Sequence, residues 1–233
     1  MEKVVQTPLG EIKFELEYKR VKNVNLRIVR GGGVHVSAPR GIAFSVIEGF
    51  ISEKAEFILR AVERFSALPE ERAANEYGSG DFLTLFGRAY PISLHSSKRA
   101  SVTIADGKAF IFVKDTANAD ERRRVAERFL AGELLRVTAE FTDRLFPPFE
   151  ARGIPQPALK VRNMSSRWGS CHTKKGIITF ALALAEKPLA CVEYVVMHEL
   201  VHLIHPNHSP TFHAEMSRLM PDWKARKRAL NGR

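Results

Sequence analysis

Several features that mark large classes of protein are scarce or absent in this chain of 233 residues. It has only two cysteines, Cys171 and Cys191, which excludes a fold held together by a framework of disulfide bonds. Residues 1–16 alternate charged and apolar side chains, unlike a secretory signal peptide. No apolar run approaches the roughly 20 residues that a membrane-spanning helix needs. We therefore expect a cytoplasmic protein with no membrane partner.

Acidic residues are the minority among the charged ones. Asp and Glu number 26 against 36 Lys and Arg, which gives a formal net charge of +10. This excess is compatible with a nucleic acid, an acidic protein or a phosphorylated small molecule as partner. The sequence contains no recognisable nucleic-acid motif and no basic strand interleaved with aromatic residues, so we favour an ordinary solvated basic surface. Nothing in the composition indicates an oligomeric state.

The chain also has an H-E-x-x-H motif, which consists of His198, Glu199 and His202. On a helix, residues four apart share one face, so the two histidines can hold one metal ion between them. Glu199 is rotated by about 100° from His198, which places it beside the metal without making it a ligand. The helix around the motif is apolar on nearly its whole circumference and is therefore predicted to be buried. Zinc at such a site, with an open position beside a carboxylate, activates water.

The residues after the motif govern the choice of a third ligand. Pro206 is expected to end the helix, and Asn207 permits the chain to reverse. Ser209 has the character of an N-cap, with Pro210 at the first position of a second helix. His208 would then lie in a tight turn, from which its side chain can reach back over the first helix.

Three other residues compete with His208 for this role. His205 lies three positions after His202, and His213 lies in the second helix. Glu215, also in the second helix, is the type of ligand that some zinc peptidases recruit from a following helix. We favour His208 over Glu215, and both over the other two, but the spacing leaves the choice open.

The first half of the chain has the alternating pattern of half-buried strands. One helix is expected from Ser45, where Glu48 lies at capping-box spacing, and residues 69–80 read as a polar connector. We predict a β-rich subdomain over residues 1–115. Its expected strands, of which the second and third form a hairpin, are 11–18, 25–30, 34–37, 81–86, 90–94, 101–104 and 109–113.

The second half begins with a helical pattern. Asn118 and Glu121 form a capping signal for a long helix that ends at a pair of prolines. Two strand-like segments, 158–162 and 176–182, lie between this helix and the metal helix. This order predicts an α+β fold in which residues 116–233 form a zincin-like core: a supporting helix, a small sheet and the H-E-x-x-H helix.

Between the two strand-like segments lies Arg167-Trp168-Gly169-Ser170-Cys171. We interpret it as a tight turn or a strand edge near the metal cleft, where an edge could hold a peptide by strand addition. Arg167 is a candidate for stabilising negative charge in a transition state. Trp168, Gly169 and Cys171 are more simply explained by packing, because no base accompanies the thiol.

These two signatures together resemble the YgjP-like metallopeptidase domain family. The resemblance rests on the segment from His198 to Phe212 and on the segment from Arg167 to Cys171, and it extends over most of the chain. The family is similar to the zincins that include the SprT-like and WLM proteases. The resemblance implies zinc held by three histidines at the positions of His198, His202 and His208, with Glu199 as the catalytic residue. One departure is His213, where members usually have tryptophan.

We therefore predict a zinc-dependent hydrolase, and first of all a metallopeptidase in which Glu199 is the general base and zinc is the cofactor. A peptide or protein would be its substrate. One alternative is a zinc hydrolase of a phosphorylated small molecule such as a nucleoside triphosphate, since arginines can clamp phosphates. A further alternative is a module with structural zinc that binds nucleic acid through its basic surface.

Overall fold

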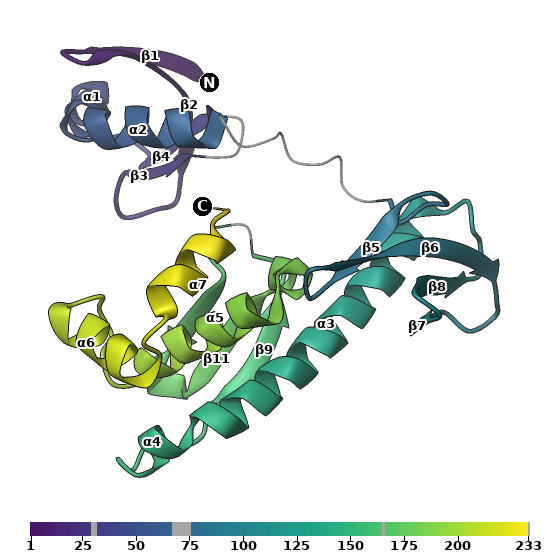
Figure 1. Ribbon diagram of the computed structural model, residues 1–233. Helices are drawn as coiled ribbons and strands as arrows, with labels where there is room; N and C mark the ends of the chain where they lie inside the picture. Colours follow the sequence, from purple (N-terminus) through teal and green to yellow (C-terminus); the bar gives the residue numbers. More distant parts are fainter. Residues whose placement is uncertain (29–31, 67–75, 165, 233) are drawn as a thin grey trace. The chain divides into compact units, whose positions relative to one another are not determined.

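The chain folds into two compact units, Met1–Ala74 and Asn75–Arg233, each with its own hydrophobic core. The boundary that we predict after residue 115 falls inside the second unit. The structure is a computed structural model, and the residues that it describes are 1–28, 32–66, 76–164 and 166–232 (Figure 1).

The first unit contains a four-stranded mixed sheet of order β1-β2-β4-β3. The central pair, β2 and β4, is parallel, and the two outer pairs are antiparallel. Alternate residues of β2, namely Ile12, Phe14 and Leu16, are each 2% exposed, as the two-residue period of a strand requires. The strands are β1 Glu2–Thr7, β2 Gly10–Lys19, β3 Asn25–Ile28 and β4 Val34–Pro39. The predicted hairpin is confirmed as the β3–β4 pair, although its residues 29–31 lie outside the described residues.

Our prediction of a single helix from Ser45 is wrong, because the structure has two helices there, α1 (Phe44–Glu53) and α2 (Ala55–Ser66). The predicted cap is also wrong. Ala43 is the N-cap, and its side chain makes no hydrogen bond. Phe44 packs against the first core, which draws the start of the helix one position ahead of Ser45. Most of the predicted connector at 69–80 lies outside the described residues.

The second unit begins with another four-stranded mixed sheet, of order β5-β6-β8-β7. Here β6 and β8 form the parallel central pair, and the outer pairs are antiparallel. The strands are β5 Phe82–Leu85, β6 Arg88–Ser96, β7 Ser101–Ala105 and β8 Lys108–Val113. All four correspond to strands that the alternating pattern predicts.

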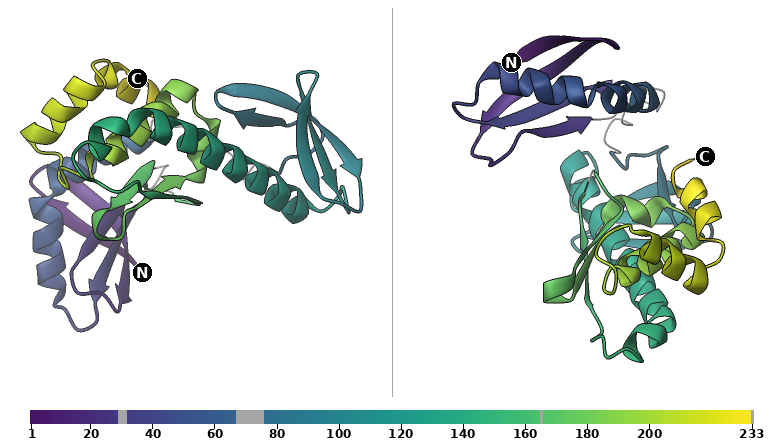
Figure 2. Two further views of the ribbon diagram at one scale, coloured as in Figure 1. Left: turned by 90° about the horizontal axis from the view of Figure 1, so that it is seen from below. Right: turned by 90° about the vertical axis from the view of Figure 1, so that its left-hand side faces the viewer.

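The long helix α3 (Ala119–Leu145) connects this sheet to the rest of the second unit. Its predicted cap is confirmed, since Oδ1 of Asn118 accepts the backbone N–H of Glu121 at 3.0 Å. The short helix α4 (Pro147–Glu150) follows where the two prolines stop α3. The sheet β5–β8 lies at one end of α3, and β7 and β8 contact it there (Figure 2).

A second sheet of the same unit, of order β10-β11-β9, supports the helices that carry the site. Strand β11 runs parallel to β9 and antiparallel to β10, which is an edge strand. Helix α3 contacts β9, and α5 contacts β10, so the supporting helix and the metal helix pack on one sheet as predicted. The strands and two short 3-10 helices are β9 Ala158–Arg162, β10 Gly169–His172, η2 Thr173–Lys175, β11 Ile177–Ala181 and η3 Leu182–Glu186.

Three helices complete the unit: α5 Leu189–Val201, α6 Pro210–Leu219 and α7 Trp223–Leu230. Our prediction that α5 continues to Pro206 is wrong. After Val201, the N–H groups of Leu203 and Ile204 bond to carbonyl oxygens three residues back, as in a 3-10 turn. The α-helix therefore ends before Pro206. The predicted start of α6 is confirmed by Ser209, whose hydroxyl accepts the N–H of Phe212 at 3.3 Å. Helix α7 was not predicted.

The mixed helices and sheets confirm the α+β class. Among the residues that the structure describes, no helix combines the length and apolarity needed to cross a bilayer.

Candidate metal centre

The residues predicted to bind metal lie on helix α5 and in the turn that follows it. Helix α5 contacts α3, α6, α7 and β10, so protein surrounds most of it. Val192, Val196 and Leu200 on this helix are fully buried. Polar side chains on such a helix have lost water and require a partner.

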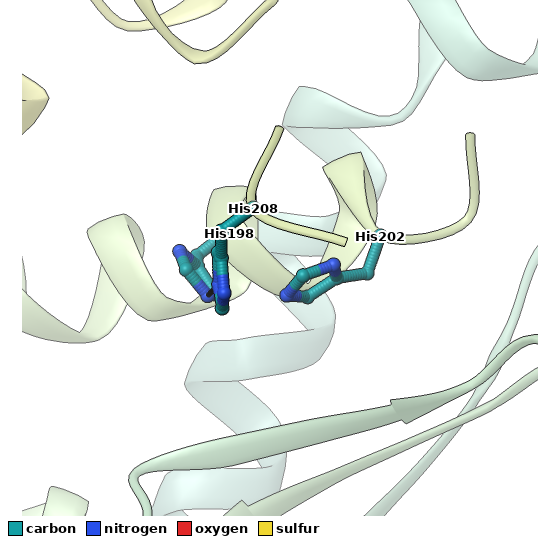
Figure 3. Close-up of side chains that lie close together, drawn as sticks. All are labelled: His198, His202 and His208. Atoms are coloured by element: carbon teal, nitrogen blue, oxygen red, sulfur yellow. Dashed lines mark hydrogen bonds between the residues drawn. The ribbon is translucent and has the colours of Figure 1, made fainter. Parts of the chain in front are cut away.

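The three histidines predicted as ligands lie together, with their rings turned toward one another (Figure 3). Their candidate ligand atoms all lie within 4.8 Å of one another. The ring centroids of His198 and His202 are 4.8 Å apart, and that of His208 lies 4.9 and 4.7 Å from them. Among the described residues this cluster has three members, the number that leaves a fourth zinc position open for water or substrate.

The ring nitrogens of the three histidines are close enough together to bind one metal ion. Nδ1 of His202 lies 3.0 Å from the carbonyl oxygen of His205, and donation to that oxygen leaves Nε2 free to bind metal. Nε2 of His198 and Nε2 of His208 face each other at 3.0 Å. Two neutral imidazole nitrogens at this distance can share at most one proton, whereas a cation beside both would accept both lone pairs. The residues present therefore fit zinc.

Burial also keeps these rings in the form that binds metal. Burial, followed by the charges of His202 and His208, lowers the pKa of His198 from 6.5 to about 3. Burial likewise lowers the pKa of His208. Both rings are therefore neutral at neutral pH, and a metal ion has no proton to displace from them.

Glu199 is the buried carboxylate beside the cluster. It is 4% exposed, and its Oε2 has no hydrogen-bond partner among the described residues. Burial raises its pKa to about 8, and the positive charge of Arg167 opposes this rise. A buried carboxylate oxygen without a partner is costly, and in a functional site its partner is a ligand or water.

Gly169 on β10 leaves the space that this carboxylate occupies. A β-carbon at that position would lie 2.6 Å from Oε1 of Glu199, well inside van der Waals contact. The backbone of β10 therefore lies directly against the Glu199 side chain. Any larger residue at this position has to displace it.

The cluster opens into a cavity of about 610 Å³ within the second unit. A volume of this size is in the range of ligand sites. Its walls come from the loop before β10, from β10 itself, from α5 and the turn after it, and from α7. Besides the histidines and Glu199, the lining includes Arg167, Gly169, Cys171, Tyr194, Lys227 and Asn231.

The segment from Arg167 to Cys171 is the edge strand β10 together with the loop before it. Trp168 packs against the second core, and Nζ of Lys187 lies 5.3 Å from its ring centroid. Burial, with a contribution from Glu199, raises the pKa of the Cys171 thiol to about 11. This thiol is therefore protonated at neutral pH and unsuited to act as a nucleophile. Arg167 is exposed and lines the cavity.

The rivals of His208 make other contacts. Oε1 of Glu215 forms ion pairs with Nη2 of Arg152 at 2.9 Å and with Nη2 of Arg218 at 2.8 Å. The ring of His213 stacks on Trp223 with centroids 5.4 Å apart. His205 contributes its carbonyl oxygen rather than its ring. Within the described part of the chain, only His208 joins His198 and His202 in a cluster of candidate ligand atoms.

Several residues of the cavity were not predicted, among them Tyr194, Lys227 and Asn231. Tyr194 precedes His198 by four positions, so helical spacing alone could have placed both on one face. It is 5% exposed, and its ring centroid lies 5.8 Å from that of His198. Lys227 and Asn231 belong to α7 and its C-cap, and no local pattern predicts the contact between α7 and α5.

Comparison with known proteins agrees with this geometry. A family model described as "YgjP-like, metallopeptidase domain" matches residues 22–233. No curated protein matches the chain. A metallopeptidase family implies a divalent metal, which is consistent with the three-histidine cluster. The match covers nearly the whole chain, confirms the resemblance that the motifs indicate, and shows that the chain belongs to the YgjP-like metallopeptidase domain family.

Proposed function

We propose that the protein is a zinc-dependent peptidase in which Glu199 is the general base. The observation that supports this most is a buried carboxylate beside three clustered histidines, all of which line one cavity. His198, His202 and His208 would hold the zinc. A purely structural zinc site has four protein ligands and no use for a free carboxylate beside them.

Each residue of the site has a chemical role in this proposal. Zinc would polarise the peptide carbonyl and make water acidic near neutral pH. Glu199 accepts the proton of the attacking water and later delivers it to the nitrogen of the leaving amine. Burial raises the pKa of Glu199, which makes the carboxylate a stronger base, while a cation beside it keeps it ionised. Arg167 stabilises the negative charge that develops on the carbonyl oxygen.

The edge strand β10 supports a peptide as the substrate. It pairs with β11 on one side, and among the described strands no other pairs with it. Its residues Gly169, Ser170 and Cys171 line the cavity next to Glu199. An extended peptide can add to such an edge through backbone hydrogen bonds, which would hold a scissile bond beside the metal site.

The Glu199→Gln variant tests this function. We expect the variant to keep about one zinc per chain and to lose hydrolysis of an unfolded protein substrate by about 10²- to 10⁴-fold, the contribution of a general base. Zinc would be measured by elemental mass spectrometry and cleavage by mass spectrometry of the products. Unchanged cleavage with unchanged zinc would refute the role of Glu199.

Glu215→Gln is the matched control. It removes the same charge from the neighbouring helix α6, where Glu215 is paired with Arg152 and Arg218. We expect zinc and activity to stay close to those of the unaltered protein. Loss of zinc in this variant would reinstate Glu215 as a ligand.

A second candidate function is hydrolysis of a phosphorylated small molecule, such as a nucleoside triphosphate. The observation that favours it is the presence of two cations, Arg167 and Lys227, in the cavity wall. Release of phosphate or pyrophosphate by the unaltered protein but not by Glu199→Gln, without cleavage of any peptide, would support this candidate over the peptidase.

A further inference from the structure

Helix α7 contributes a polar wall to the cavity. Lys227 lies within this helix, and Asn231 is its C-cap, one turn later on the same face. Both side chains are exposed, and both line the cavity that contains the three histidines. The contact of α7 with α5 fixes this wall to the metal helix.

Lys227 differs from its neighbour Arg226 in how its charge is balanced. Arg226 pairs with Asp222 at 2.8 Å and also with Glu193, so its charge is neutralised within the protein. Among the residues that the structure describes, Lys227 forms no ion pair, and its Nζ lies 5.8 Å from the centroid of the Trp223 ring. Its charge is therefore available to a molecule in the cavity.

Positively charged side chains outnumber negatively charged ones in the cavity wall. The charged side chains in its wall are Arg167 and Lys227, which are positive, and Glu199, whose carboxylate lies beside the histidine cluster. An excess of positive charge in a cleft concentrates negatively charged ligands there.

We propose that Lys227, together with Asn231, forms a binding subsite for a carboxylate of the peptide substrate close to the scissile bond. The carboxylate belongs either to an acidic side chain or to a free C-terminus, and the same cation recognises both. Lys227 would be the charged anchor, and the Asn231 amide would donate a second hydrogen bond. This inference rests on the proposed peptidase function and specifies the class of peptide that the site selects.

The test uses the full-length, zinc-loaded protein and a peptide whose cleavage site is first identified from a peptide library by mass spectrometry. Four synthetic forms of that peptide carry Glu or Gln near the scissile bond, each with a free or an amidated C-terminus. We expect a carboxylate to raise kcat/KM by roughly tenfold, the effect of one additional ion pair of ~1.4 kcal/mol. The Glu/Gln pairs and the free/amidated pairs distinguish the two sources of the carboxylate.

Lys227→Glu should remove this preference or reverse it. Lys224→Glu is the matched control, because it makes the same charge change on the same helix outside the cavity lining. We expect the control to keep the preference and both variants to keep zinc. The preference should also weaken at high salt, since the cation is exposed.

Two results would overturn the proposal. The unaltered protein could cleave the four peptides equally, or zinc-loaded Lys227→Glu could retain the full preference. Failure of the unaltered protein to cleave any library peptide would refute the peptidase function itself and this inference with it. That outcome is distinct from cleavage without a charge preference, which refutes only the subsite.

Discussion

The two units begin with sheets of the same topology. In the first unit the strand order is β1-β2-β4-β3, and in the second it is β5-β6-β8-β7, with a parallel central pair and antiparallel outer pairs in both. The units differ in the elements that come after these sheets. The first continues with the short helices α1 and α2, whereas the second continues with α3, a second sheet and the helices that carry the histidines.

This difference shows that the shared sheet is a scaffold and does not itself provide the chemistry. The candidate metal cluster, the buried Glu199 and the cavity around them all belong to the elements added after β8 in the second unit. Function depends on such sites rather than on the topology that supports them. Changes made in the two units should therefore have separable effects.

The largest effect is expected from His202→Ala. Removal of this imidazole should abolish zinc binding and reduce hydrolysis to the uncatalysed level, because two ligands cannot retain the metal. His35→Ala in the first unit is the control, since that partly exposed histidine pairs with Glu15 on the neighbouring strand. The zinc content of both variants would be measured by elemental mass spectrometry. Retained zinc in His202→Ala would mean that the cluster is not the metal site.

Chelation of the metal should destabilise only one of the two units. Separate cores predict two thermal transitions. Zinc at about 1,000 times its Kd stabilises the unit that binds it by about 4 kcal/mol, so its removal should lower that transition by on the order of 10 °C. Calorimetry of the full chain with and without chelator measures this shift. An equal shift of both transitions would show that the units unfold together.

A cavity in the first core should produce the opposite pattern. Ile51 on α1 is fully buried, and Ile51→Ala should cost about 2–5 kcal/mol of the first unit's stability while zinc content and activity persist. Val46→Ala on the same helix is the control, because Val46 is 53% exposed and should have little effect. Calorimetry measures the stability of the first unit in both variants, and a zinc assay measures their metal content. Loss of zinc in Ile51→Ala would show that the stability of the first unit affects metal binding in the second.

The same substitution should have opposite effects at two glycines. Gly169→Ala places a carbon 2.6 Å from Oε1 of Glu199, so we expect kcat to fall about 10- to 100-fold, worth ~1.4–2.8 kcal/mol, with zinc retained. Gly49→Ala in α1 meets nothing within 4 Å and should stabilise the first unit by about 0.5–1 kcal/mol. Steady-state kinetics would reveal the first effect and calorimetry the second. Full activity in Gly169→Ala would show that Glu199 tolerates displacement.

The smallest effect concerns the thiol of Cys171. Its pKa, raised by burial to about 11 from 9.0, means that less thiolate is present at any pH below 9. At pH 8 we expect alkylation by iodoacetamide about 100-fold slower than that of an ordinary thiol, rising as pH increases toward 11. Mass spectrometry of the intact and the denatured protein provides the comparison. Rapid alkylation at pH 8 would show that the Cys171 thiol is reactive and would contradict the raised pKa.

Much of the fold follows from local pattern. The strands β5 to β8, the Asn118 cap of α3 and the Ser209 cap of α6 were predicted, because each depends on residues within a few positions of one another. The start of α1 was not, because Phe44 packs against strands far away in the sequence. The repeated strand order was also invisible, since an alternating pattern identifies a strand but not its partner.

By itself, the sequence determined that His198 and Glu199 lie on one buried helix and that His202, the C-cap of that helix, lies one turn after His198, because backbone hydrogen bonds fix the helical spacing within a single turn. Only the tertiary structure decided that His208 rather than Glu215 completes the cluster, since Arg152 and Arg218 engage that glutamate. It alone brought Gly169 against Glu199 and Lys227 to the cavity wall. Such contacts join elements distant in the chain, and their geometry depends on how the whole core packs rather than on any local spacing.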